Sequence, residues 1–351
     1  MVPVNTEIRI FTAQKKQGMA FKKITFVLIV LFLISAYTLS AQEKAVPKSG
    51  EGITLFLKRH NRTGKEHYKQ FIELNKNKLG KGNTLRMGVK YTLPPLQKNT
   101  AVTRRKNYEP LFGKELAQYN VTSSELKDAC FYLVSGHGGP DPGAIGKVGK
   151  IELHEDEYAY DIMLRLARNL LMKGAKVHII IQDTKDGIRN AKYLNNSKRE
   201  TCMGSTIPFS QFRRLEQRCN KINRLYKKDK ESYRRALFIH VDSRHKGKQT
   251  DVFFYHSLKS EQSKQLAKTL RSTFNSKYNK HQPGRGFKGT VEKRSLYVLN
   301  HTVPVSAFVE LGNIQNSDDQ KRLVLSDNRQ ALANWLCEGF VTDYKRTIKK
   351  K

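Results

Sequence analysis

The sequence predicts an α/β fold in which a twisted, largely parallel or mixed sheet is flanked by helices, with a small α+β module ahead of it. From residue 131 onward, short β-branched runs alternate with segments whose apolar residues recur every three or four positions. This alternation is typical of parallel sheets with helical crossovers. Polar residues follow directly after several of these runs, at the edge where open α/β sheets form their sites.

The individual elements follow from these patterns. The predicted strands are 131–135, 176–181, 236–241, 250–255, 296–300 and 305–309. The predicted helices are 157–172, 212–226, 261–274 and 328–344. Gly174 stands where the C-terminus of the first helix favours a glycine. Residues 184–210 are polar with little periodicity, and we interpret them as a long insertion.

The N-terminus has the layout of a signal peptide. Five basic residues precede the apolar run 26–34, and small residues follow up to Ala41. This pattern predicts a signal peptide at residues 1–41, with export to the periplasm or cell envelope. Leu39 stands three residues from the cleavage point, where signal peptides usually have a small residue. An uncleaved segment that anchors the chain is therefore the competing interpretation, although the run is short against the ~20 residues of a spanning helix.

Composition separates the rest of the chain into parts. We expect a linker at residues 42–50, a small module at 51–95, a basic linker at 96–125 and a catalytic domain at 126–348. The small module is predicted to run strand, helix, helix, strand. It resembles a LysM domain, a glycan-binding module, through Gly52, the helix end at 71–75 and the segment 88–94. A basic docking or spacer module is the alternative.

The chain is very basic, with a formal net charge of +34. Loss of residues 1–41 removes five basic residues and one acidic residue, which lowers this charge to +30. Such an excess attracts polyanions. Because the chain is predicted to be exported and has no recognisable nucleic-acid motif, we expect no nucleic-acid partner, and anionic cell-envelope polymers fit better. Contact with a membrane is expected only through an uncleaved signal segment.

The four cysteines, Cys130, Cys202, Cys219 and Cys337, show no spacing typical of zinc binding. An even number in an exported chain is compatible with disulfides, and buried thiols are the alternative.

Three residues far apart in the chain are candidate ligands of one zinc ion. His137 and His240 each follow or end a predicted strand, and Glu155 precedes the first predicted helix. Two imidazoles and one carboxylate are a ligand set of catalytic zinc, with one position left for water. Glu155 has close competitors, namely Glu152, His154, Asp156 and Glu157.

Further residues are candidates for supporting roles. Glu310 ends another predicted strand and is the candidate general base. Asp141 and Asp242 are candidates to orient the imidazoles. The glycines 138 and 139 would let the backbone pass close to the metal and the substrate.

Residues 130–345 resemble the zinc-dependent N-acetylmuramoyl-L-alanine amidases of the Amidase_3 family. The matching segments are 136–144, the helix from Glu155 through 161–167, Leu215 with Arg218 and Asn223, 238–240, 299–304, and 309–312 with Asn316. The resemblance implies one zinc ion held by His137, Glu155 and His240, with Glu310 catalytic. It also implies cleavage of the amide between N-acetylmuramic acid and L-alanine in peptidoglycan, as in wall remodelling or daughter-cell separation.

The resemblance adds Arg218 and Asn316 as candidates for contact with the site or the substrate, and leaves room for a protein activator. This chain departs from the family where Val134 and Ser135 replace Asp-Pro, and where Asp242 replaces Asn.

Two other functions stay open. One is a non-catalytic peptidoglycan-binding protein with this fold, and the other is a zinc endopeptidase that acts on peptidoglycan. A self-inhibiting role of residues 184–210 is a further hypothesis.

Overall fold

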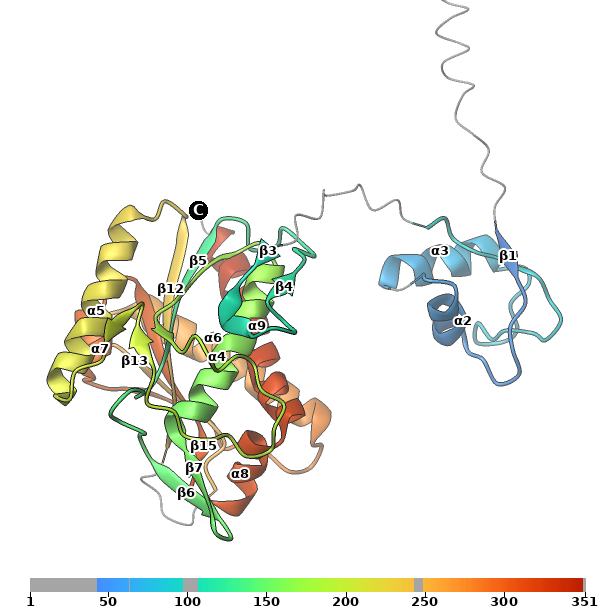
Figure 1. The fold of residues 1–351 in the computed structure, drawn as a ribbon. Coiled ribbons are helices and arrows are strands. Elements are labelled where there is room, and N and C mark those ends of the chain that lie inside the picture. The colour runs from blue at the N-terminus through green and yellow to red at the C-terminus, as the bar shows by residue number, and fades with distance from the viewer. Residues whose placement is uncertain (1–42, 63, 97–106, 243–248, 350–351) are drawn as a thin grey trace, which may run out of the picture. The chain divides into compact units, whose positions relative to one another are not determined.

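The computed structural model describes residues 43–62, 64–96, 107–242 and 249–349, without the side chain of Asp242. The chain divides into two compact units, with the boundary between residues 102 and 103 (Figure 1). The predicted signal peptide lies outside the described residues. Within the described ranges, no helix combines the length and the apolarity that a membrane crossing needs.

The N-terminal unit contains a strand, two helices and a strand, but its first strand lies ahead of residues 51–95, where the whole order was predicted. Its elements are β1 (Lys44–Ala45), α2 (Ile53–Arg59), α3 (Lys65–Asn75) and β2 (Tyr91–Thr92). The two strands pair antiparallel, with Lys44 opposite Thr92. The linker expected at 42–50 is therefore wrong in part, because its first residues form a strand whose partner comes almost fifty residues later.

One polar residue ties this unit together. Asn75 is buried at the end of α3, and its side chain donates to the carbonyls of Phe71 and Thr92 at 2.9 and 2.8 Å. Its side-chain oxygen accepts from the backbone N–H of Thr92 at 2.8 Å. The core beside it is aromatic, with Phe56, Phe71 and Tyr91 fully buried. Asn75 thus joins the second helix to the closing strand.

The segment after residue 106 belongs to the C-terminal unit. It contains β3 (Asn107–Tyr108), the 3₁₀ turn η1 (Pro110–Phe112) and β4 (Gln118–Tyr119), and the two strands pair with each other. Leu111 and Phe112 are buried in the main core. Residues 107–125 of the basic linker expected at 96–125 are therefore part of the C-terminal unit, while residues 97–106 lie outside the described part.

A six-stranded mixed sheet forms the centre of the C-terminal unit. In spatial order it contains β14 (Thr290–Lys293), β13 (Phe253–His256), β15 (Val305–Asn313), β12 (Tyr233–Asp242), β5 (Ala129–Ser135) and β8 (Lys176–Ile179). Strand β13 runs antiparallel to β15, and the other neighbouring pairs are parallel. The predicted mixed α/β sheet is confirmed.

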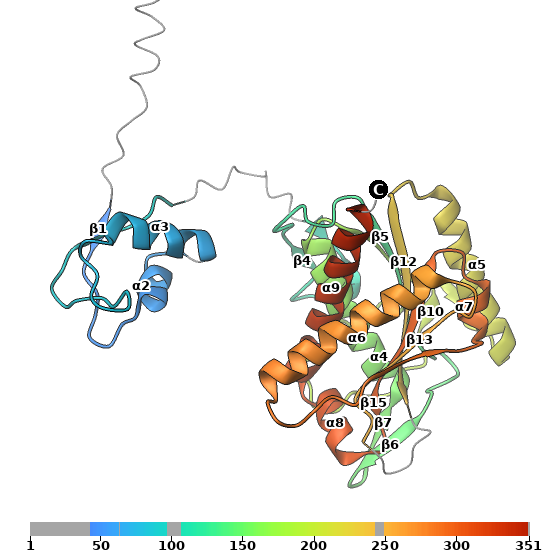
Figure 2. The ribbon, with the colours of Figure 1, turned by 180° about the vertical axis from the view of Figure 1, so that it is seen from behind.

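Helices cover both faces of this sheet (Figures 1 and 2). One face packs against α4 (Glu155–Met172), α6 (Glu261–His281), α8 (Ser317–Val324) and α9 (Ser326–Ile348). The other packs against α5 (Gln211–Lys228) and α7 (Tyr297–His301). Successive residues of a strand alternate between the faces. In β12, Leu237 and Ile239 therefore face the α4 side, and Ala236 and Phe238 face the α5 side.

One predicted strand is wrong. Residues 296–300 fall largely in helix α7, where the His301 ring nitrogen lies 2.9 Å from the Tyr297 carbonyl oxygen. The strand that pairs parallel with β13 is β14, which ends three residues before the predicted strand begins. A short apolar run does not distinguish a strand from a buried helical turn, and packing against α5 decided it here.

The insertion is more ordered than its composition predicts. Strand β9 (Ile181–Gln182) pairs with β10 (Thr201–Cys202), which pairs with β11 (Ser205–Thr206). Leu194 and Ile207 are buried. The hairpin of β6 (Ile145–Val148) and β7 (Ile151–His154), like helix α8, was not predicted. All four cysteines are buried free thiols, which agrees with the second of the two interpretations, buried thiols rather than disulfides.

Candidate metal centre

His137, Glu155 and His240 converge at the carboxyl edge of the sheet. Their ligand atoms all lie within 4.8 Å of one another. Nε2 of His137 lies 3.3 Å from Oε2 of Glu155, and Nδ1 of His240 lies 2.9 Å from Oε1 of the same carboxylate. His137 follows β5, His240 lies near the end of β12, and Glu155 opens α4. Residues separated by 103 positions in the chain are thus brought together by neighbouring parallel strands.

The backbone holds the Glu155 carboxylate in place. Its two oxygens accept from the N–H groups of Ala144 and Val241, at 2.8 and 3.0 Å. The first helical turn also favours a carboxylate, because the backbone N–H groups there point out of the helix.

The other residues considered as the carboxylate or imidazole ligand near Glu155 lie in different surroundings. Glu152 is exposed and pairs with Lys147, and His154 contacts the side chain of Asn196. Asp156 and Glu157 are buried on the side of the insertion. Burial, together with the charges of Glu157 and Glu200, raises the pKa of Asp156 to about 9. Of the acidic residues at this helix start, Glu155 is the one placed against both histidines.

The loop after β5 adopts a demanding backbone conformation. His137 has a φ of +56°, which non-glycine residues seldom adopt outside constrained sites. A Cβ on Gly136 would lie 2.3 Å from the His240 ring, and a Cβ on Gly143 would lie 2.7 Å from both His137 and Glu155. Glycine at these two positions is what lets the three ligands come this close.

Gly138 and Gly139 make room for a segment that was not expected beside them. Their missing Cβ atoms would meet Glu200 and Ile207 of the insertion, at 3.3 and 3.1 Å. These glycines therefore allow the insertion to approach the loop that carries His137. The prediction for these glycines was instead a close approach of the backbone to the metal and the substrate.

Asp141 lies against His137, as expected for a residue that orients an imidazole. Its Oδ2 is 2.8 Å from Nδ1 of His137 and accepts from Nη2 of Arg214 at 2.6 Å. Arg218 is almost fully buried and donates to the His137 carbonyl. Arg214 was not predicted as a site residue, although it lies four residues before Arg218 and therefore on the same helical face.

The charges of the site are strongly coupled. Burial opposes protonation of His137, but the carboxylates of Glu155 and Asp141 outweigh it and raise the pKa of His137 to about 10. Burial also opposes ionisation of Glu155, yet the two histidines hold its pKa well below the usual range. Burial lowers the pKa of His240, which favours the neutral imidazole, and lowers that of Arg218 to about 10.

A cavity of about 240 Å³ opens on the α5 side of the histidines. Its lining includes both histidines, Arg214, Arg218 and Phe308. The Phe308 ring stacks on His240, with ring centroids 4.3 Å apart. The cavity thus combines an apolar wall with two guanidinium groups, a lining suited to a ligand that carries carboxylates.

Glu310 is buried beside His240, its register partner across the parallel β12–β15 pair. It lies two residues after Phe308, so both side chains face the α5 side of the sheet. Adjacent strands are about 4.8 Å apart, which places Glu310 beside the candidate ligand His240.

The remaining predicted residues are less informative. The side chain of Asp242 lies outside the described part. Asn316 caps helix α8, where its side-chain oxygen accepts from the N–H groups of Asp318 and Asp319 at 3.0 Å each. This structural role accounts for Asn316 without a contact to the metal, and its proposed role at the site stays a prediction.

A second group of metal-type donors lies near the other end of β5. Cys130, His178 and Asp229 are close enough to share an ion. However, the Asp229 carboxylate is already bound by Lys176 at 2.6 Å and by the Tyr132 hydroxyl at 2.7 Å. A lysine ammonium in this position neutralises the carboxylate, so the group is satisfied as an ion-pair network.

The first group fits zinc better, because it offers two imidazole nitrogens and a carboxylate oxygen beside an open cavity. Asp141 on the far nitrogen of His137 matches the carboxylate–histidine arrangement of zinc sites.

Comparison with known proteins identifies a protein family whose model matches this chain. The model of the N-acetylmuramoyl-L-alanine amidase family matches residues 132–341. Among solved structures, the N-acetylmuramoyl-L-alanine amidase of Clostridium difficile 630 is 20% identical over 62% of this chain and 98% of its own, with a TM-score of 0.45. AmiC2 of Nostoc punctiforme is 20% identical over 64% and 99%, with a TM-score of 0.44. The CwlD amidase of Clostridioides difficile, in complex with the GerS lipoprotein, is 18% identical over 62% and 98%, with a TM-score of 0.46. No curated protein matches the chain.

Proposed function

Because the chain belongs to the N-acetylmuramoyl-L-alanine amidase family, we propose that it is a zinc-dependent hydrolase that cleaves the amide between N-acetylmuramic acid and L-alanine in peptidoglycan. The observation that carries this proposal is the convergence of His137, Glu155 and His240, with Glu310 in register beside His240.

The residues of the chain have separate roles in the proposed reaction. His137, Glu155 and His240 would hold one zinc ion, which supplies a Lewis acid and lowers the pKa of water. Glu310 takes the proton from the attacking water and passes it to the leaving nitrogen of L-alanine. Asp141 keeps His137 in the required orientation, and Arg218 holds the backbone of the same loop.

Arg214 and Arg218 give the cavity a preference for anionic substrates. Guanidinium groups bind carboxylates in pairs of hydrogen bonds. Peptidoglycan stem peptides carry such carboxylates close to the scissile amide. We therefore assign the stem peptide, rather than the glycan, to the arginine side of the cavity.

The proposed setting is the cell envelope. We infer export from the layout of residues 1–41, and wall binding by the N-terminal unit from its resemblance to a LysM domain. The positive charge of the chain would further hold it near anionic envelope polymers. A protein activator stays an open part of this proposal.

The test is digestion of purified peptidoglycan by protein that begins at residue 42, with chelator and with zinc restored. Products are resolved by mass. Stem peptides that begin with L-alanine, released from intact glycan only when metal is present, support the amidase. Cleavage within the peptide would indicate an endopeptidase, and binding without products would indicate a non-catalytic wall protein.

A further inference from the structure

Behind the metal centre, three acidic side chains are buried together. Asp156 and Glu157 belong to the first turn of α4, and Glu200 comes from the insertion just before β10. Their exposed fractions are 3%, 1% and 7%, and one carboxylate oxygen of each lies within 4.8 Å of those of the other two. Buried carboxylates of like charge repel, and each loses its hydration, so such a cluster needs a compensating positive charge.

The described residues supply only part of that compensation. Arg189 pairs with Glu157 at 2.8 Å, and Glu200 accepts from the backbone N–H of Gly139 at 2.8 Å. Asp156 accepts through Oδ1 from the N–H of Glu157, but its buried Oδ2 has no hydrogen-bond partner in the described part of the chain. No described lysine or arginine forms a salt bridge with Asp156 or Glu200. One guanidinium therefore faces three carboxylates.

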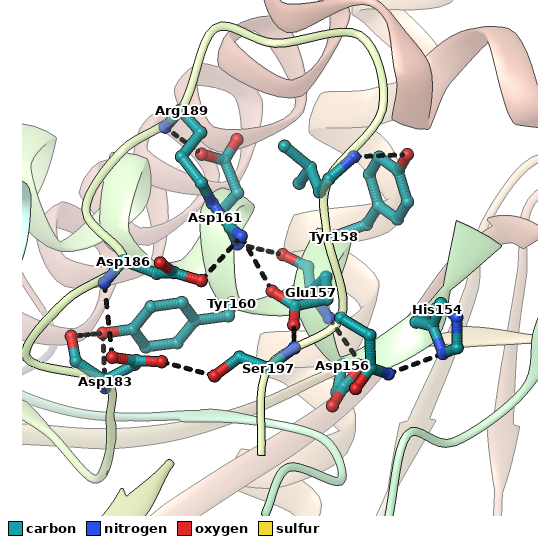
Figure 3. A network of polar contacts seen from close by, with 12 residues as sticks. His154, Asp156, Glu157, Tyr158, Tyr160, Asp161, Asp183, Asp186, Arg189 and Ser197 are labelled. Carbon is teal, nitrogen blue, oxygen red and sulfur yellow. Dashed lines mark hydrogen bonds and ion pairs between the residues drawn. The ribbon is translucent and has the colours of Figure 1, made fainter. Parts of the chain in front are cut away.

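The insertion is held firmly on this side of α4 (Figure 3). The Ser197 backbone N–H donates to Glu157, and its hydroxyl donates to Asp183 at 2.7 Å. The Arg189 backbone N–H donates to Asp161 at 2.7 Å. Because these bonds order the chain on the way to Glu200, the three carboxylates are brought together by a defined structure rather than by chance contact of mobile side chains.

We propose that Asp156, Glu157 and Glu200 bind a hard divalent cation, Ca²⁺ or Mg²⁺, at a second site next to the zinc centre. An all-carboxylate donor set suits these ions, whereas zinc favours the nitrogen-containing set of His137 and His240. The unpartnered Oδ2 of Asp156 supplies a free ligand position. The ion balances the charge that Arg189 leaves uncompensated.

The site would couple the insertion to the metal centre. Glu200 binds Gly139, which lies two residues after His137 in the same loop. An ion shared by Glu200 and the first turn of α4 joins this loop to the turn that carries Glu155. Occupancy should therefore stiffen the surroundings of the zinc ligands and raise the thermal stability of the C-terminal unit.

The test measures binding of Ca²⁺ and Mg²⁺ by isothermal titration calorimetry, together with thermal unfolding at each ion concentration. It uses the chain from residue 42, both unchanged and with His137→Ala and His240→Ala combined. The double variant removes the imidazoles of the zinc centre. Ion binding at the second site can therefore be measured whether or not the zinc proposal is right. We expect one ion per chain in both proteins and a rise in Tm of about 3 °C or more at saturation.

Two variants locate the ion. Asp156→Asn and Glu200→Gln keep the side-chain shapes and should each weaken binding at least about tenfold, since each removes one charged ligand. Without the ion, Asp156→Asn should unfold at about the Tm of the unchanged chain, because the raised pKa of Asp156 leaves its carboxyl uncharged at pH 7. Glu200→Gln should unfold at or above that Tm, because it removes a buried charge. The control is Glu152→Gln, on the exposed neighbouring strand, which should bind as the unchanged chain does.

Absence of binding by either ion would overturn the proposal and would mean that a proton neutralises the cluster. Unchanged affinity in both Asp156→Asn and Glu200→Gln would also overturn it, since the ion would then lie elsewhere.

Discussion

Glu310 and His240 show how the position of single side chains sets the chemistry. They are register partners on neighbouring parallel strands, and the Phe308 ring covers His240 from the same face. Glu310 thus lies beside the candidate ligand His240 while it belongs to a different strand. This placement suits a proton carrier that works beside the metal without binding it.

Glu310→Gln should therefore keep zinc and lose turnover. The amide keeps the shape of the side chain but cannot accept the proton, so the rate should fall by about 10² to 10⁴. Zinc content after dialysis and release of L-alanine peptides measure the two effects. Glu261→Gln, on the exposed start of α6, is the matched control. Loss of zinc from Glu310→Gln would instead place Glu310 among the ligands.

Proton release should accompany zinc binding at His137. Without metal, Glu155 and Asp141 raise its pKa to about 10, so the ring is protonated at pH 7. Zinc binds the neutral imidazole, and the proton must leave. We expect about one proton released per ion at pH 7, and an affinity that rises with pH up to about pH 10.

Calorimetry in buffers of different ionisation enthalpy counts this proton. Asp141→Asn removes one of the two carboxylates that favour the protonated ring, so this variant should release fewer protons. Heats that do not depend on the buffer would contradict the assignment.

At the scale of elements, helix α9 joins the parts of the C-terminal unit through Arg329. This side chain is completely buried and binds the Asp161 carboxylate on α4 at 2.6 Å. It also donates to the carbonyls of Arg189 and Ala191 in the insertion, at 2.7 and 2.9 Å. One guanidinium therefore connects α9, α4 and the insertion.

Arg329→Leu should destabilise the C-terminal unit by about 3 kcal/mol, because it leaves the buried Asp161 with less compensation and deprives the carbonyls of Leu323 and Ala191 of this donor. Urea unfolding measures the change. Arg213→Leu, which removes an exposed pair with Glu216, should cost about 0.5 kcal/mol or less. A loss of similar size in both variants would show that Arg329 contributes no more than a surface charge.

At the scale of the whole molecule, the chain has two units with separate cores. The candidate metal centre lies entirely in the C-terminal unit, and the strand, helix, helix, strand elements that would bind the wall lie in the N-terminal one. This separation predicts that hydrolysis and wall binding can be removed independently.

Residues 103–351 alone should hydrolyse a soluble muramoyl peptide with a kcat/KM within about twofold of the longer chain, but should bind less to intact peptidoglycan. Sedimentation with peptidoglycan and a soluble assay measure the two properties. Binding that is unchanged by the truncation would assign wall attachment to the basic C-terminal unit. A loss of soluble activity would show that the N-terminal unit takes part in catalysis.

Most of the α/β fold and the three residues that converge at the candidate metal centre were accessible from the sequence, because their signals are local. Periodicity distinguishes long helices from buried strands, and a histidine after a buried strand marks the functional edge of a sheet. Only the tertiary structure showed that residues 296–300 fall largely in a helix, that Arg214 binds Asp141, and that Glu200 joins Asp156 and Glu157. These outcomes depend on which distant segments become neighbours, and nothing in a residue's own surroundings in the sequence encodes the charge or volume it will meet there.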